Sequence, residues 1–149
     1  MGRRGRRSHG RLRWAGVAAD NVALSFRLYD DLRTGGIDAV RASWSDDVIL
    51  VDAAELPDAG TFRGKDAVAA RFQERMDLGF RYSMKIERDA LDDERVFATI
   101  MVPRSSMDLA FGYSQIATWR DGRAVETREY LDGDRAEQAA SEARGRREQ

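Results

Sequence analysis

The sequence places polar side chains where strands should bury apolar ones. Residues 113–132 predict two β-strands joined by an Asp-Gly turn. Their inward positions carry groups that could do chemistry, namely Tyr113, Gln115, Thr127 and Glu129. A second carboxylate, Asp52, directly follows the apolar run at residues 48–51. Two carboxylates in one apolar cavity raise the pKa of one of them, so that the pair can serve as an acid and a base.

Structural roles for the same carboxylates stay open. Asp52 could cap a loop by accepting hydrogen bonds from the backbone amides of Ala54 or Glu55. Glu129 could form a salt bridge with its neighbour Arg128 or, across the sheet, with Arg104. The chain has no cysteine and one histidine, His9, which excludes a thiolate nucleophile and a zinc site of the usual kind. We therefore expect neither a metal nor a cofactor.

Composition predicts one folded domain. The chain has 149 residues, 42% hydrophobic and 34% charged, and a chain of this length buries roughly two thirds of its unfolded surface. No apolar run could span a membrane or follow the N-terminal arginines as a signal, so we expect no membrane partner and a cytoplasmic location. Six arginines give the first thirteen residues a charge of +6, and the net charge of −1 leaves −7 for the rest. This acidic remainder argues against a nucleic-acid partner.

The order of the predicted elements is typical of an α+β fold. We expect a disordered basic extension over residues 1–19, a folded domain over 20–140 and a charged tail over 141–149. Apolar periodicity predicts three helices, over residues 20 to about 33, 37–44 and 65–78, with Gly35 and Gly36 ending the first. The apolar face is predicted to consist of Val22, Phe26, Tyr29 and Leu32 in the first helix and of Val68, Phe72 and Met76 in the third. Strands are predicted over residues 48–52, 80–87, 95–102, 107–119 and 123–131.

Three motifs, taken in order, resemble the SnoaL-like branch of the nuclear transport factor 2-like (NTF2-like) superfamily. They are Gly-Gly-Ile-Asp-Ala at residues 35–39, Trp-Ser-Asp-Asp at 44–47, and the terminal pattern from Trp119 to Asp132 with its internal Gly-Arg and Tyr-x-Asp. The resemblance covers residue 20 to about 140. It implies a cone of three N-terminal helices packed on a curved, mostly antiparallel sheet that encloses a pocket, and a homodimer formed through the outer face of the sheet.

The resemblance also gives Asp52 a role. It falls where the ketosteroid isomerases of the superfamily place the aspartate that moves a proton between substrate carbons. The resemblance favours a hairpin with Gly122 in a bulge, which pairs Tyr113 with Glu129 and puts the polar hairpin residues on the concave side. The isomerase tyrosine falls on Leu28 and its second acid on Gln115, so a true ketosteroid isomerase is not expected.

Two other chemistries occur in the superfamily. Its aldol cyclases rely on histidine with aspartate, which His9 cannot supply, and its epoxide hydrolases rely on arginine with paired aspartates, for which the sequence assigns no arginine. The predicted catalytic residues are Asp52 and Glu129. The predicted ligand-binding residues are Leu28, Trp44, Leu50, Phe72, Tyr113, Gln115 and Thr127.

Two classes of function follow from these residues. In the first, the pocket holds a small, mostly apolar metabolite and Asp52 performs cofactor-free acid/base catalysis of an isomerase, cyclase or hydrolase type. In the second, the domain is a noncatalytic ligand-binding or dimerisation module. An acid, a hydrogen-bond donor and a second titratable group within hydrogen-bond distance of one another in the pocket would favour catalysis.

Overall fold

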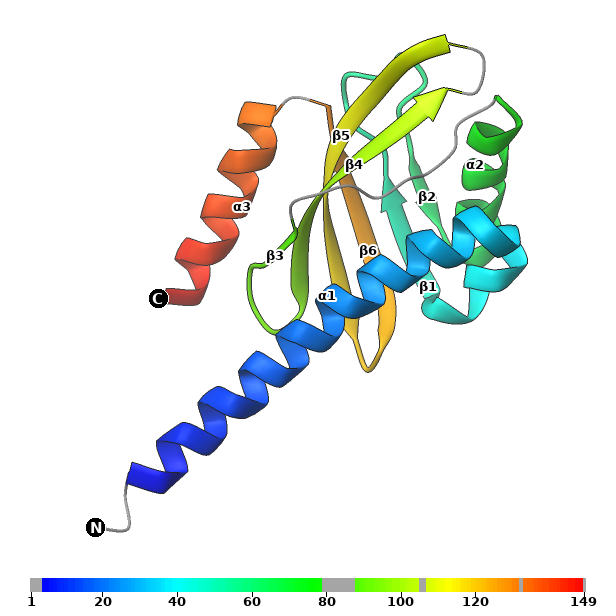
Figure 1. Ribbon diagram of the computed structural model, residues 1–149. Helices are drawn as coiled ribbons and strands as arrows, with labels where there is room; N and C mark the ends of the chain where they lie inside the picture. Colours follow the sequence, from blue (N-terminus) through cyan, green and yellow to red (C-terminus); the bar gives the residue numbers. More distant parts are fainter. Residues whose placement is uncertain (1–3, 79–87, 105–106, 132, 149) are drawn as a thin grey trace.

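The computed structural model describes residues 4–78, 88–104, 107–131 and 133–148, and they form one layered α+β body (Figure 1). In chain order the elements are α1 (Arg4–Val40), the 3-10 turn η1 (Arg41–Ser43), β1 (Trp44–Val51), β2 (Thr61–Arg63), α2 (Lys65–Asp77), β3 (Arg88–Ala90), β4 (Arg95–Arg104), β5 (Met107–Arg120), β6 (Arg123–Tyr130) and α3 (Gly133–Glu148). The strand predicted over residues 80–87 lies outside the described residues.

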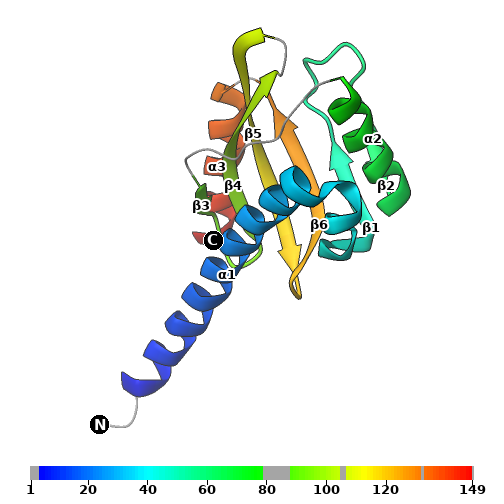
Figure 2. The ribbon, with the colours of Figure 1, turned by 45° about the vertical axis from the view of Figure 1, so that its right-hand side comes forward.

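The strands form one sheet in the order β2-β1-β6-β5-β4-β3. All neighbouring strands are antiparallel except β1 and β6, which are parallel. Helices α1 and α2 cover one face of the sheet, which we call the inner face, and α3 lies against the opposite, outer face (Figures 1 and 2). The α+β class and the mostly antiparallel sheet are thus confirmed.

The prediction of three N-terminal helices is not confirmed. The expected break does occur, because Gly36 has φ 72° and ψ −165°, a left-handed conformation that glycine adopts at little cost. The four residues after this kink continue as the end of α1, and η1 follows, so no separate second helix forms. The third helix comes after the last strand. Within the described residues the sheet is open at β2 and β3, so an enclosed pocket is not confirmed either.

Both ends of the described chain are helical. Residues 4–19, for which the sequence predicts disorder, belong to α1, and residues 141–148 belong to α3. Residues 4–19 lack proline and contain five arginines and three alanines, which favour helix, and an established helix extends more easily than a new one begins. Figure 1 shows the first part of α1 reaching beyond the sheet. The domain limits at residues 20 and 140 stay predictions.

The β5–β6 hairpin differs from the predicted register. Asp121 and Gly122 have φ of 52° and 78° and form a two-residue turn that pairs Arg120 with Arg123. A bulge then follows, so that Glu129 lies opposite Gln115 and not opposite Tyr113. The predicted pairing was wrong because the bulge lies within the strands and not at the turn. The error is two residues, which leaves every side chain on its predicted face.

The main core lies between the inner face, α1 and α2. It includes Leu32 of α1, Val68 and Phe72 of α2, and Leu50 and Ile100 of the sheet, all at most 3% exposed. A second, smaller cluster lies under α3 on the outer face, and its buried members are Leu91, Phe97, Ala136, Ala140 and Ala143. No helix of the described chain is both long and apolar enough to cross a membrane.

Candidate functional site

Asp52 and Glu129 are buried side by side on the inner face. Val51 pairs with Arg128 across the parallel strands β1 and β6, so the residues that follow each of them become neighbours. The side chain of Asp52 is 0% exposed and that of Glu129 is 3% exposed. The structure therefore brings the two predicted catalytic carboxylates together.

Arg75 of α2 joins the two carboxylates. Its Nη2 donates to Asp52 Oδ1 at 2.5 Å and to Glu129 Oε1 at 2.9 Å, and its Nη1 donates to Glu129 Oε2 at 2.9 Å. The guanidinium thus holds Glu129 with two parallel hydrogen bonds and Asp52 with one. Since α2 packs over β1, a residue near the end of this helix reaches both strands.

Arg71, one turn earlier on α2, holds the other oxygen of Asp52. Its Nη2 donates to Asp52 Oδ2 at 2.8 Å, and its Nη1 donates to Asp58 at 3.0 Å and to Glu74 at 3.3 Å. The guanidinium carbon also lies 5.2 Å from the centre of the Phe62 ring, a cation–π contact. The inner cluster contains two arginines and two carboxylates and is neutral when all four are ionised.

The backbone completes the surroundings of Asp52. The Gly60 amide donates to Asp52 Oδ2 at 3.2 Å, and the Asp52 amide donates to the Gly60 carbonyl at 3.0 Å. Asp52 therefore does tie down the loop that follows β1, although through Gly60 and not through Ala54 or Glu55. Glu129 does form an ion pair, with Arg75 of a helix. The contacts that would give Asp52 and Glu129 a structural role are therefore the same contacts that would position them for catalysis.

Electrostatics differentiates the members of the cluster. Burial raises the pKa of Glu129, Arg75 opposes this effect, and the negative charge of Asp52 adds to it. Burial disfavours the charged form of Arg71, but its hydrogen bonds to Asp58 and Asp52 hold the pKa of Arg71 above its ordinary value. The buried site thus favours the protonated form of Glu129 more than water does.

The predicted ligand-binding residues lie in the same core. Leu28, Trp44, Leu50, Phe72, Tyr113 and Gln115 are each at most 6% exposed, and Thr127 is partly exposed. The rings of Trp44 and Phe72 stack with their centres 5.8 Å apart. The hydroxyl of Tyr113 interacts with the carboxylate of Glu129 and lowers its pKa. Among these predicted residues, Tyr113 contacts Glu129, and Gln115 lies opposite Glu129 in the β5–β6 pairing.

Three participants were missed by sequence reasoning. Two of them are Arg71 and Arg75, each of which directly precedes a residue on the predicted buried face of the helix, Phe72 or Met76. The two arginines are four residues apart, so they lie on one side of the helix next to that face, and this spacing was the available signal. The third is Tyr29, whose hydroxyl donates to Gln115 Oε1 at 2.5 Å. Tyr29 is buried together with Leu28, because the buried stripe of α1 is wide enough to include both positions.

The described residues offer no metal centre. No group of three or more histidine, cysteine, aspartate or glutamate side chains among them is placed to hold a metal ion. The polar atoms of the site are instead arranged as donors on arginine, tyrosine and glutamine and as acceptors on two carboxylates. Such a set can bind a polar group of an organic ligand and can move protons.

Comparison with known proteins supports the architecture. A family model described as a SnoaL-like domain matches residues 26–127. Among solved structures, an NTF2-like protein from Burkholderia xenovorans LB400 is 24% identical with a TM-score of 0.61, over 82% of this chain and 96% of that chain. A putative SnoaL-like polyketide cyclase from Jannaschia sp. CCS1 is 18% identical with a TM-score of 0.60, over 75% and 85%.

A third solved structure was obtained with a ligand. TerC, co-crystallised with polyporic acid, is 18% identical with a TM-score of 0.62, over 82% of this chain and 98% of that chain. No curated protein matches this chain by sequence. Identities this low establish a shared fold and leave the chemistry to the residues of the site.

Proposed function

We propose that this chain, which belongs to the SnoaL-like domain family, binds a small, mostly apolar metabolite on the inner face of its sheet and performs cofactor-free acid/base chemistry on it. Two similar structures favour such a ligand, since one is a putative SnoaL-like polyketide cyclase and another was crystallised with polyporic acid. The apolar wall would be the stacked rings of Trp44 and Phe72, and the polar end would be the carboxylate pair.

The observation that carries the proposal is the bridge that Arg75 makes between Asp52 and Glu129. Asp52 lies against two guanidinium groups and has the role of the base that takes a proton from water. Glu129, whose pKa is raised by burial, has the role of the acid that returns a proton to the oxygen released from the substrate. Because Arg75 contacts both carboxylates, its positive charge compensates whichever of them is ionised at each step of the proton transfer.

Among the reaction types, this arrangement favours hydrolysis. The epoxide hydrolases of the superfamily rely on arginine with paired aspartates, and the bridge here has the same composition except that Glu129 stands for one aspartate. In such a reaction the water oxygen forms a bond to a ring carbon as the strained C–O bond of that carbon breaks. One carboxylate takes a proton from the water, and the other gives a proton to the ring oxygen, which stays on the product as a hydroxyl. The contact from Tyr29 orients Gln115, whose amide would hold the polar group of the substrate.

A noncatalytic binding domain is the second candidate. It is favoured by the ion pairs themselves, because each carboxylate oxygen of Asp52 and Glu129 accepts a hydrogen bond from an arginine, and this can serve a purely structural role. In that case the ligand would be held by the apolar wall alone. The homodimer and the cytoplasmic location stay predictions from the resemblance and from composition.

The experiment combines binding and turnover. The wild-type protein and the variants Asp52→Asn and Glu129→Gln are screened against apolar epoxides and enolisable ketones, with thermal shift to detect binding and product analysis to detect turnover. The matched control is Glu126→Gln, three residues along the same strand and on the outer face. Catalysis predicts that both site variants still bind but lose turnover by at least about 100-fold, whereas the control retains it.

Each alternative has its own result. Binding by all the variants without turnover by any of them identifies the noncatalytic domain. Turnover that survives Glu129→Gln unchanged contradicts the assigned acid, and the absence of binding to any apolar compound contradicts both candidates.

A further inference from the structure

A hollow of about 490 Å³ lies between α1 and two turns of the sheet, and we call it the end hollow. The two turns join β3 to β4 and β5 to β6, and Figure 1 shows both at the same end of the sheet. Glu129 lies opposite Gln115, which precedes Trp119 of the hollow by four residues, or about 13 Å of strand. The end hollow is therefore separate from the acid/base site.

Hydrogen bonds hold the walls of the end hollow in place. Asn21 of α1 is 5% exposed, and its Nδ2 donates to the backbone carbonyl of Asp93 at 2.8 Å. The backbone amide of Trp119 donates to the carbonyl of Glu94 at 2.7 Å. The helix, the β3–β4 turn and the hairpin are thus joined around the hollow. The residues of α1 that line it share one side of the helix, and they are Val17, Asp20, Asn21 and Leu24.

Carboxylates dominate the charge of the end hollow. They belong to Asp20, Asp93, Glu94 and Asp121, and one guanidinium, that of Arg120, lies among them. Arg120 is paired with Glu94 at 3.2 Å, and within the described residues the other three carboxylates have no ion pair. The same part of the chain brings no three acidic side chains close enough together to hold a metal ion. An extended organic cation therefore fits these dispersed charges better than a metal ion does.

Trp119 gives an independent indication of a ligand. Its side chain is 2% exposed and lines the end hollow. The indole Nε1–H is buried, and no acceptor lies within hydrogen-bond distance of it among the described residues. A buried donor without an acceptor costs free energy, which an oxygen atom placed beside it recovers. Because the ring borders the hollow, a ligand inside it is in position to supply that oxygen.

Apolar surface is also open in the end hollow. Val17 is 47% exposed, and Leu24, two turns further along the same side of α1, is partly buried. Methylene groups of a ligand that cover these side chains would remove apolar surface from water. A cationic group on an aliphatic stem, as in derivatives of lysine and arginine, combines such a cover with a positive charge.

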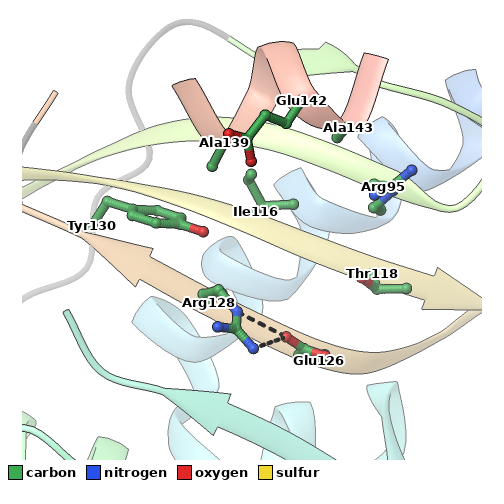
Figure 3. Close-up of a pocket in the computed structure, with 9 residues that line it drawn as sticks. All are labelled: Arg95, Ile116, Thr118, Glu126, Arg128, Tyr130, Ala139, Glu142 and Ala143. Carbon is green, nitrogen blue, oxygen red and sulfur yellow. Dashed lines mark hydrogen bonds and ion pairs between the residues drawn. The ribbon is translucent and has the colours of Figure 1, made fainter. Parts of the chain in front are cut away.

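The hollow under α3 has a different balance of charge. It has a volume of about 370 Å³ and lies on the outer face. Figure 3 shows the pair of Arg128 and Glu126 on β6, and Arg95 and Glu142 around the same space. Two arginines match two glutamates there, so this hollow does not favour a cation over an anion. A carboxylate of this hollow therefore offers a matched control.

We propose that the end hollow binds a small organic cation that has an aliphatic stem and an accepting oxygen, the chemistry of an amide or ester of a basic amino acid. Its charge lies against the unpaired carboxylates, its stem covers Val17 and Leu24, and its oxygen accepts from Trp119 Nε1. This inference is independent of the proposed function, because it uses none of the residues of the acid/base site.

The test titrates the full-length protein with L-argininamide. Nitrogen–proton correlation NMR resolves the indole N–H signals of the three tryptophans, and the variants Trp14→Phe, Trp44→Phe and Trp119→Phe assign them. Any two of these variants are sufficient for the assignment. We expect L-argininamide to move the Trp119 signal to lower field and to reach saturation, because the indole gains a hydrogen bond, and to leave the Trp44 signal in place.

Two further probes separate the charge from the oxygen. Putrescine has positive charges and methylene groups but no accepting oxygen, and propanamide has the oxygen but no charge. Both should bind more weakly than L-argininamide, and putrescine should not move the Trp119 signal to lower field. Added salt should weaken the binding of L-argininamide, since its ion pairs lie near the surface.

A double variant tests the carboxylates. Asp20→Asn combined with Asp121→Asn removes two exposed negative charges, and asparagine tolerates the left-handed backbone of position 121, where φ is 52°. Loss of two screened ion pairs should weaken the binding of L-argininamide by about fivefold or more. The control Glu142→Gln removes a carboxylate from the hollow under α3 and should leave the affinity unchanged.

The contrary results are equally definite. A Trp119 signal that L-argininamide does not move would overturn the proposal, as would an equal shift with propanamide. Equal affinities of the double variant and the wild-type protein would also contradict it. Binding that Glu142→Gln weakens as much as the double variant does would place the cation under α3 instead of in the end hollow.

Discussion

Asp52 accepts hydrogen bonds from two arginines at once, and one of these, Arg75, also binds both carboxylate oxygens of Glu129. All three of these charged side chains are buried. The positive charge of Arg75 compensates the negative charges of Asp52 and Glu129. Buried ion pairs add little stability compared with apolar packing, but removal of one member leaves an uncompensated charge. The bridge therefore makes both the stability and the chemistry of the domain depend on Arg75.

The first prediction concerns removal of the bridge. Arg75→Met should lower the free energy of unfolding by about 3–5 kcal/mol, because two carboxylates lose their shared partner in a buried site. Urea denaturation followed by circular dichroism measures the change. The control is Arg33→Met, since the Arg33–Asp30 pair is more than half exposed on both sides and should contribute less than about 1 kcal/mol. Equal effects of the two variants would contradict the structural role of the bridge.

The second prediction concerns pH. The pKa of Glu129 is raised in the folded protein above its ordinary value of 4.5. A carboxyl whose folded pKa is raised binds more protons when folded, so its contribution to stability is fully present below pH 4.5 and is lost as the pH rises through the folded pKa. The contribution of Glu129 to the unfolding free energy should therefore fall over this rise in pH.

Glu129→Gln tests the assignment because glutamine resembles the protonated acid. The difference in unfolding free energy between this variant and the wild-type protein should grow in favour of the variant as the pH rises above 4.5. Urea denaturation at a series of pH values gives that difference. A difference that stays constant with pH would show that the pKa of Glu129 does not contribute to the pH dependence of stability.

The sequence predicts much of this site because strand periodicity determines which side chains share a face. Glu129 and Gln115 follow an alternation of two residues, so even a register wrong by two leaves them on the inner face. Asp52 follows an apolar run, and a residue that ends a buried strand is positioned by that strand. The fold class follows from the order of helices and strands in the same way.

The arginines could not be predicted in the same way. The long side chain of Arg75 can reach solvent from a helix face as readily as it can reach a buried carboxylate, and only the tertiary distance between α2 and the strands decides between them. The role of α3 was missed for a related reason. Alanine at positions 136, 140 and 143 gives little hydrophobic signal, although small side chains are what close contact with the sheet requires.

The third prediction compares two phenylalanines of the helices. Phe72 is 3% exposed and stacks on Trp44, so Phe72→Ala should cost about 3–5 kcal/mol of unfolding free energy through lost burial and the cavity that remains. Phe26, which the sequence predicts on the buried face of its helix, is 43% exposed, and Phe26→Ala should cost much less. Thermal and urea denaturation of both variants measure the contrast, and a larger loss for Phe26→Ala would show that the exposed ring is buried in solution.

The fourth prediction concerns the hairpin that carries Glu129. Gly122 has φ 78° in the turn, a conformation that a side chain disfavours, so Gly122→Ala should cost about 1 kcal/mol of unfolding free energy. Gly145→Ala is the control, because Gly145 lies within α3 with open space around it, and alanine there should stabilise the helix by up to about 1 kcal/mol. Opposite signs for the same substitution, measured by urea denaturation, would confirm the left-handed turn. A loss of stability for both variants, or for neither, would mean that the turn does not impose this conformation, and the hairpin register that places Glu129 opposite Gln115 would then need another cause.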